Sequence, residues 1–389
     1  MMVSAMGDVV ALGGRSVRIV PRRFREAREA LELSMEDVGL LVGKTRQAIS
    51  LYEAGEREPD PATLMKLVHE LQQPIAYFTS DRPNNFGQRG PTFFRSFKSK
   101  TKRTNKRCEV LSDWFVQTAS FFSKFVNFPQ TSLPVIDSPK SGSEYADEEI
   151  EEAATACRRF WGLGDGPISN TVTLLESRGI VVARAEFGVD TVSAFSFWEG
   201  GRPFIFLGAD KQSAARSRFD AVHELGHLIL HRGISEEDLE SDLDRFEREA
   251  NRFASAFLLP ESTYSLEVFS TRLAAFVELK RRWKVSIAAQ IYRCSDLGIL
   301  ADDQVLNLRK QLSANKWRKR EPLDDVLPFE KPNMMRKSLH LLVESGVQTG
   351  SDVLAAIRLS RKTIESLLST AVPIPDAEEA VPEDIPRLR

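Results

Sequence analysis

Apolar positions recur every three or four residues between residues 21 and 80, a spacing that predicts several short helices. Ser34 has the position and chemistry of an N-cap for the second helix, and Gly43 supplies the tight turn that ends it. Asp60 followed by Pro61 opens a fourth helix. Four or five short helices with a glycine turn between the second and third predict an all-α helix-turn-helix domain.

Strand-like runs occupy the middle of the chain. Residues 180–183 are β-branched and apolar, and the runs 192–197 and 203–207 flank Glu199-Gly200-Gly201, which is a hairpin signal. These runs predict a small antiparallel sheet. A largely apolar helix over 219–231 follows the sheet, so the expected fold class of the whole chain is α+β.

Helical spacing returns after the sheet. A helix over residues 245–259 ends at Pro260, and another is expected over 286–300. The inward stripe of the first of these two helices consists of Phe246, Ala250, Phe253 and Phe257. Three further short helical patterns follow at 334–343, 352–357 and 362–368. These three patterns fit a second helix-turn-helix or helices that dock on the catalytic domain, and docking is favoured.

Composition limits the possible classes of protein. At 389 residues the chain should contain two to four domains, and its 42% hydrophobic and 28% charged residues are those of a soluble globular protein. The net charge of −2 restricts any DNA binding to a local basic surface, such as the acid-free basic run between residues 95 and 107. Three widely spaced cysteines indicate reduced thiols, and a missing membrane span or signal sequence indicates a cytoplasmic location.

The apolar helix over 219–231 carries the motif His223-Glu224-Leu225-Gly226-His227. Residues four apart on a helix lie about 40° apart around its axis, so His223 and His227 can bind one metal ion. Glu224 lies about 100° from His223 and projects beside the metal, where it can take a proton from metal-bound water. The motif therefore predicts a Zn²⁺ site with Glu224 as the general base.

A catalytic zinc ion needs a third protein ligand and one open position. Glu247 and Glu249 are both candidates, and Glu247 is favoured because it lies one helical turn before Asn251. Asn251 would then orient a ligating histidine through a hydrogen bond. His231 is expected to support a ligand or to lie in the core. Tyr264 is a weak candidate for stabilising the oxyanion of the reaction.

Residues 42–55 (VGKTRQAISLYEAG), with Glu56-Arg57-Glu58-Pro59 after them, resemble the recognition helix of the XRE (Cro/CI-like) family. The resemblance covers about residues 21–80. It implies operator-like DNA as a partner and is compatible with a homodimer. Met35 stands where the family usually has a phosphate-contacting Gln, so a dimerisation or protein-binding module is the alternative. The residues that it places toward the major groove are Lys44, Thr45, Arg46, Gln47 and Ser50.

The pairing of HELGHLILH (223–231) with EREANRFASAFLLP (247–260) resembles the ImmA/IrrE family of metallopeptidases. Trp161-Gly162-Leu163-Gly164 and Trp283-Lys284-Val285-Ser286 add to the likeness, which covers roughly residues 21–322. It implies a zincin-like fold and a gluzincin-like zinc metalloendopeptidase. The resemblance also implies the ligands His223, His227 and Glu247, with Glu224 as the base. Members are linked to cutting repressors in phage, mobile-element and stress regulation, and others act as antitoxins.

Two functions of different classes follow from these observations. The leading hypothesis is a zinc endopeptidase that joins DNA binding to cleavage of a repressor-type protein in stress, phage-related or defence control. The alternative is a transcription regulator or antitoxin whose zinc fold senses a signal and cuts little. A plain aminopeptidase would leave the DNA-binding domain unexplained. The expected parts are an extension (1–20), the XRE domain (21–80), a linker with a basic run and a long helix (81–145), the peptidase domain (146–330), a small C-terminal helical domain (331–370) and a disordered tail (371–389).

Overall fold

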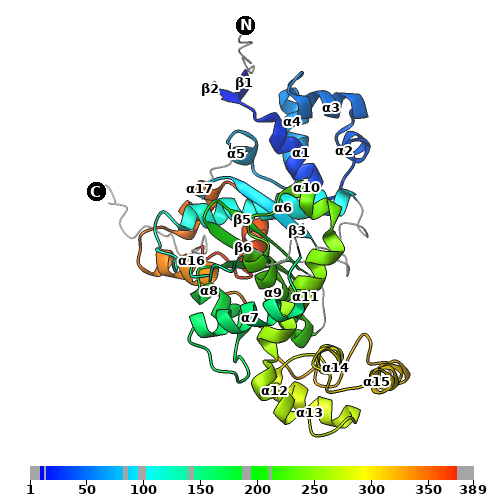
Figure 1. Cartoon of the computed structure of the whole chain (residues 1–389). Helices are drawn as coiled ribbons and strands as arrows, with labels where there is room; N and C mark the ends of the chain where they lie inside the picture. The colour runs from blue at the N-terminus through cyan, green and yellow to red at the C-terminus, as the bar shows by residue number, and fades with distance from the viewer. Residues whose placement is uncertain are drawn as a thin grey trace. The chain divides into compact units, whose positions relative to one another are not determined.

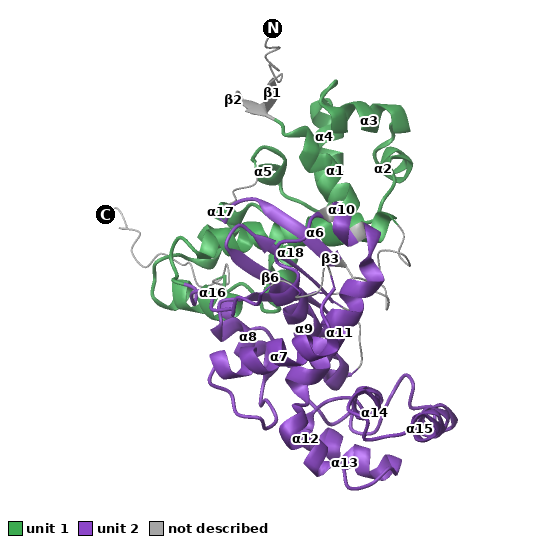
Figure 2. Cartoon of the chain, in the orientation of Figure 1, with its two compact units in different colours: residues 1–84, 102–127, 335–389 green, residues 85–101, 128–334 purple. Residues whose placement is uncertain are grey.

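The computed structural model describes residues 9–12, 15–81, 86–94, 102–137, 139, 144–185, 194–209 and 213–374. These residues belong to two compact units, shown in two colours in Figure 2. Unit 1 comprises residues 1–84, 102–127 and 335–389, and unit 2 comprises residues 85–101 and 128–334. Many helices and a small mixed sheet (Figure 1) confirm the predicted α+β class.

Unit 1 begins with the expected helix-turn-helix arrangement. Its helices are α1 (Pro21–Ala30), α2 (Met35–Val42), α3 (Arg46–Ala54), α4 (Pro61–Glu70) and α5 (Ile75–Phe78). Ser34 caps α2 in a reciprocal capping box with Asp37, and Gly43 ends α2 with a left-handed φ of 71°. Asp60 caps α4 ahead of Pro61. The predicted caps are confirmed because each satisfies backbone groups that the helix itself leaves open.

Helix α6 (Lys102–Phe122) and three C-terminal helices complete unit 1. The C-terminal helices are α16 (Met334–Glu344), α17 (Gly350–Ile357) and α18 (Arg361–Leu368). The buried Gln117 of α6 donates to the carbonyl of Ile357 over 2.6 Å, and the Gln73 side chain accepts from the backbone N–H of Ser360 over 2.9 Å. These bonds tie the C-terminal helices to the helix-turn-helix unit, whereas the sequence favours docking on the catalytic domain.

Helices α17 and α18 repeat the local design of α2 and α3. Thr349 forms a capping box with Asp352, as Ser34 does with Asp37. Arg358 ends α17 in the left-handed conformation at the position that Gly43 takes after α2. Ser360 then caps α18 at the position of Thr45 before α3. The α17–α18 pair therefore repeats the caps and spacing of α2 and α3, although α17 and α18 pack less extensively against each other than α2 and α3 do.

The N-terminal extension contains a hairpin that its sequence does not predict. Strand β1 (Val9–Leu12) pairs antiparallel with β2 (Arg15–Arg18), whereas the sequence predicts only a loose segment over residues 1–20. The antiparallel ladder supplies backbone hydrogen bonds that isolated strands lack. The expected disordered tail lies outside the described residues from position 375 onward, as do residues 95–101 of the basic run.

Unit 2 contains a four-stranded sheet in the order β3-β5-β6-β4. The strands are β3 (Arg89–Phe94), β4 (Val181–Ala185), β5 (Ala194–Glu199) and β6 (Arg202–Gly208). Strands β3, β5 and β6 are antiparallel, but β4 runs parallel to β6. The predicted all-antiparallel sheet is therefore wrong in this one pairing. The apolar run 180–183, which includes the start of β4, suits a parallel strand that is buried on both faces.

The motif helix α9 (Ala214–Leu230) packs between the sheet and α11 (Leu243–Leu258). A Cβ atom on Gly226 would lie 3.2 Å from the Cα of Ala250, so this glycine allows α9 and α11 to approach closely. Unit 2 also contains α7 (Asp147–Phe160), α8 (Thr171–Ser177), α10 (Glu236–Ser241), α12 (Glu261–Glu267), α13 (Leu273–Trp283), α14 (Ile287–Asp296) and α15 (Asp302–Ala314).

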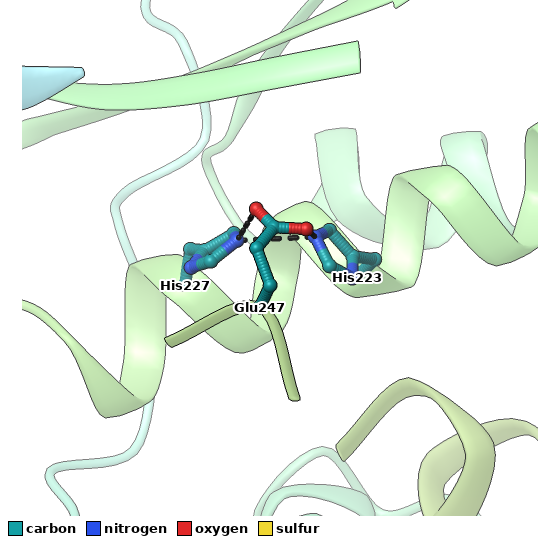
Figure 3. A group of neighbouring side chains, drawn as sticks. All are labelled: His223, His227 and Glu247. Atoms are coloured by element: carbon teal, nitrogen blue, oxygen red, sulfur yellow. Dashed lines mark hydrogen bonds and ion pairs between the residues drawn. The ribbon is translucent and has the colours of Figure 1, made fainter. Parts of the chain in front are cut away.

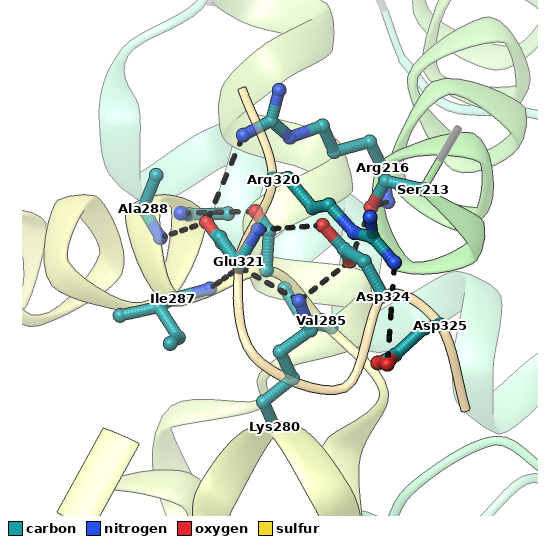
Figure 4. A network of polar contacts seen from close by, with 12 residues as sticks. Ser213, Arg216, Lys280, Val285, Ile287, Ala288, Arg320, Glu321, Asp324 and Asp325 are labelled. Atoms are coloured by element: carbon teal, nitrogen blue, oxygen red, sulfur yellow. Dashed lines mark hydrogen bonds and ion pairs between the residues drawn. The ribbon is translucent and has the colours of Figure 1, made fainter. Parts of the chain in front are cut away.

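A buried ion network braces the start of α9 (Figure 4). The Nζ atom of Lys280 lies 2.9 Å from the Glu321 carboxylate and 2.7 Å from that of Asp324, and all three side chains are at most 1% exposed. Glu321 also accepts from the first backbone N–H groups of α14, and Asp324 accepts from Ser213, the N-cap of α9. One lysine thus links the beginnings of two helices through the loop that carries both carboxylates.

We expect Lys280→Met to lower the free energy of unfolding by about 3–5 kcal/mol, because two buried carboxylates lose their cation. Denaturant titration of the full chain measures this change. Arg281→Met is the matched control, since Arg281 lies on the same helix with its side chain 61% exposed and should change stability by at most about 0.5 kcal/mol. Equal stabilities of the two variants would contradict the bracing role of the network.

Candidate metal centre

Three side chains from α9 and α11 converge on one point (Figure 3). The Nε2 atoms of His223 and His227 are 3.1 Å apart. The two carboxylate oxygens of Glu247 lie 3.4 Å from the Nε2 atom of His223 and 3.5 Å from that of His227. Both histidines are 1% exposed, while the Glu247 side chain is 13% exposed. The structure therefore brings together the three residues named as ligands from the sequence.

These distances fit a tetrahedral zinc site. Zinc ligands at about 2.0–2.1 Å from the ion are separated from each other by about 3.3–3.4 Å along the edges of the tetrahedron. The Nε2–Nε2 separation and the distance from each Nε2 atom to one of the two Glu247 oxygens lie close to that value, and one ligand atom from each residue lies within 4.8 Å of the other two. Two imidazole nitrogens and one carboxylate oxygen leave the fourth vertex for water or substrate, as a catalytic site requires.

Hydrogen bonds around the centre fix the histidine tautomers. Nδ1 of His223 donates to the side-chain oxygen of Asn251 over 3.1 Å, which leaves the Nε2 lone pair facing the centre. Nδ1 of His227 lies 2.9 Å from Nδ1 of His231, and Nε2 of His231 lies 2.8 Å from the Glu249 carboxylate. Because a carboxylate only accepts, His231 donates to Glu249, accepts from His227 and leaves the Nε2 atom of His227 as a lone-pair donor.

Electrostatics agree with this direction of donation. Burial, followed by the nearby rings of His227 and His223, lowers the pKa of His231 well below its ordinary value and keeps this ring neutral. Burial raises the pKa of Glu249, which also accepts a hydrogen bond from the backbone of Tyr145.

Glu224 lies on α9 directly after the first histidine and faces the sheet. Its Oε2 atom accepts a hydrogen bond of 2.7 Å from the hydroxyl of Ser196 on β5, and the residue is 1% exposed. Sequence reasoning did not select Ser196. The available signal was a small polar residue between Phe195 and Phe197, since alternate residues of a strand share one face. The general-base candidate is therefore oriented by strand β5 of the sheet.

The two alternative residues take other places. Glu249 is buried against His231 and the backbone of Tyr145, outside the group formed by Glu247 and the two motif histidines. Tyr264 is fully buried in the core, where its ring packs edge-on against Trp283, so its proposed role at the oxyanion is wrong. An aromatic ring with a polar end is often held in a core in this way.

A pocket of about 590 Å³ opens beside the centre. Its lining includes Glu247 and Asn251 as well as Phe219, Ala289 and Tyr292. Its mixed lining of aromatic, small and charged residues could hold part of a peptide. Glu247 is the most exposed of the three converging residues and lines this pocket, whereas neither His223 nor His227 does.

In unit 1 the residues predicted to face DNA lie at the start of α3. Arg46, Gln47 and Ser50 are exposed. Thr45 uses its hydroxyl as the N-cap of α3, accepting from the backbone of Ala48 over 3.2 Å. Lys44 forms an ion pair with Asp60, with 3.2 Å between nitrogen and oxygen. Two polar side chains and one serine hydroxyl are thus presented on the tip of α3, while Thr45 and Lys44 also hold the local fold.

Unit 2 has a metallopeptidase-like fold. Its helices α9 and α11 carry the three converging side chains beside a small sheet. Residues 175–295 match the family model described as the IrrE N-terminal-like domain of a peptidase family, and residues 24–78 match a helix-turn-helix model. The chain thus combines an XRE-type helix-turn-helix with an IrrE-type peptidase domain, which confirms the resemblance. A comparison with curated proteins gives no match. Among the described helices, none has the length and apolarity of a membrane span.

Proposed function

We propose that this protein is a zinc-dependent endopeptidase that cleaves a repressor-type regulatory protein, and that its helix-turn-helix domain binds operator-like DNA. The convergence of His223, His227 and Glu247, with Glu224 beside them, carries this proposal. Under this proposal the zinc ion is held by His223, His227 and Glu247. Asn251 and His231 orient the two histidine ligands through the hydrogen bonds described above.

Peptide hydrolysis requires a proton to move from water to the leaving amine. When bound, Zn²⁺ supplies a Lewis acid that polarises the scissile carbonyl and makes water acidic near neutral pH. Glu224 takes the proton from the attacking water and delivers it to the amine nitrogen. The Ser196 hydroxyl holds one oxygen of Glu224 and so restricts the orientation of the carboxylate that would take this proton.

Metal analysis and cleavage together test this function. We expect the purified chain to contain about one zinc ion and to cleave a helix-turn-helix repressor encoded beside it. His227→Ala should lose both the metal and the cleavage, because two ligands hold zinc far less tightly than three. A wild-type chain that carries no metal after purification in zinc-containing buffer would contradict the proposal.

One observation favours the second candidate function, a regulator or antitoxin that rarely cuts. Glu224 and both motif histidines are each 1% exposed, so the centre is closed to a protein substrate in this conformation. A closed centre suits a protein that senses a signal before it acts. The two functions differ in a cell assay, because only the peptidase loses its biological effect when Glu224 is replaced by Gln.

The DNA partner follows from the exposed tip of α3. We expect Arg46→Ala combined with Gln47→Ala to remove sequence-selective binding, since each bidentate base contact contributes about 1–3 kcal/mol of discrimination. Fluorescence anisotropy with a duplex selected from a random library and with its scrambled version measures the loss. Lys66→Ala, an exposed change on α4, is the control and should keep the selectivity. Unchanged selectivity in the double variant would disprove the role of α3.

A further inference from the structure

Strand β3 covers the edge of the sheet at the metal centre. It pairs antiparallel with β5, and Phe93 lies opposite Ser196, the residue that holds Glu224. The matched peptidase region, residues 175–295, contains β4, β5 and β6 but not β3. Strand β3 therefore joins this sheet from outside the matched region, in a chain segment that precedes α6.

Phe93 places its ring directly on the metal centre. The ring stacks on His227 with 4.7 Å between the centroids and 13° between the planes, and its centroid lies 5.9 Å from that of His231. It is 2% exposed and packs in a cluster with Leu239, Leu243 and Phe246. The Phe93 side chain thus fills an apolar site, the Phe93 cavity. This cavity is lined by Leu239, Leu243 and Phe246 and by the ring of His227, a candidate metal ligand.

The pairing of β3 is interrupted before it reaches the centre. At its start, Arg89 pairs with the buried Glu199 over 2.7 Å, and the carbonyl of Gln88 accepts from Gly200. The register then shifts between Arg89 and Thr92, where Pro91 has no N–H to give to the ladder. Residues 92–94 therefore pair with β5 separately from the start of the strand, and Phe93 anchors them in its cluster.

An exposed strand edge binds an extended peptide by adding it to the sheet. The edge of β5 beside Glu224 is suited to such a substrate, but β3 occupies it. We propose, resting on the proposed peptidase function, that residues 92–94 hold the place of the substrate. The substrate is then an extended polypeptide that runs antiparallel to β5 and puts a large aromatic or aliphatic side chain into the Phe93 cavity.

The first test measures peptide binding to the zinc-loaded full chain. The probe is a fluorescent peptide with the sequence of residues 89–94, RGPTFF, and its binding is followed by anisotropy. We expect Phe93→Ala to bind it about tenfold more tightly than the wild type, because the competing aromatic contact is lost. Thr92→Ala is the matched control on the same strand and should bind as the wild type does. A peptide with Ala in place of its first Phe should bind the Phe93→Ala chain no more tightly than it binds the wild type.

A second variant keeps the inference testable if Phe93→Ala folds poorly. Thr92 and Phe197 are direct cross-strand partners, so Thr92→Cys with Phe197→Cys can form a disulfide that locks β3 onto β5. The oxidised chain should bind no peptide, and reduction should restore binding. Equal binding in the oxidised and reduced forms would overturn the inference, as would a Phe93→Ala chain that stays folded and binds no better.

The outcomes separate this inference from the function on which it rests. Peptide binding that responds to Phe93→Ala and to the disulfide, without any cleavage, supports the docking site and rejects the peptidase. Cleavage of a repressor that is indifferent to both variants supports the peptidase and rejects the docking site.

Discussion

Glu224→Gln is expected to abolish proteolysis while the zinc content stays at the wild-type level. The amide has the size of the carboxylate and can still accept a hydrogen bond from Ser196, so the local fold should persist. It cannot take a proton from water, and positioned proton transfer contributes about 10²–10⁴-fold to a rate. Single-turnover cleavage, with metal analysis of the same sample, measures both quantities.

Ser196→Ala provides the graded comparison. It removes the hydroxyl that orients Glu224 but leaves the carboxylate, so cleavage should fall less than in Glu224→Gln while the zinc content is again unchanged. If Glu224→Gln cleaved as fast as the wild type, the proton would have to move through another group, and Glu224 would not be the general base.

The second large effect is the loss of metal in Glu247→Gln. A neutral amide is a poor zinc ligand, so zinc affinity should fall further than the 10–100-fold typical of changes in residues that support a ligand. Glu249→Gln is the matched control two residues away. This substitution weakens the hydrogen bond to His231 and should lower the zinc affinity about 10–100-fold. Competition with a zinc-binding dye measures both affinities, and the opposite order would make Glu249 the ligand.

Local sequence signals predicted the helix-turn-helix and the helices of the site. Ser34, Gly43 and Asp60 determine their caps through interactions within a few residues, so their effect is visible in the sequence. The histidine pair was equally local, because both residues lie on one helical face. Glu247 was favoured over Glu249 because it lies one helical turn before Asn251. The structure places Glu247 with the two histidines.

Interactions between distant segments were not visible in the sequence. The glycine and proline of residues 89–94 indicate a linker, and only the free edge of β5 turns this segment into a strand. The bond from Ser196 to Glu224 and the bond from Gln73 to Ser360 likewise depend on the tertiary fold. Tyr264 shows the opposite error, since a residue chosen for its chemistry is part of the core.

The connectivity of β3 has a thermodynamic consequence. The chain leaves unit 1 after residue 84 and re-enters it at residue 102, so the segment that pairs with β5 is covalently attached to unit 1 at both ends. Any ligand of unit 1 that binds differently when β3 is paired and when it is released shifts this equilibrium. Reciprocity then requires a peptide that displaces β3 to change the affinity of unit 1 for that ligand by the same factor.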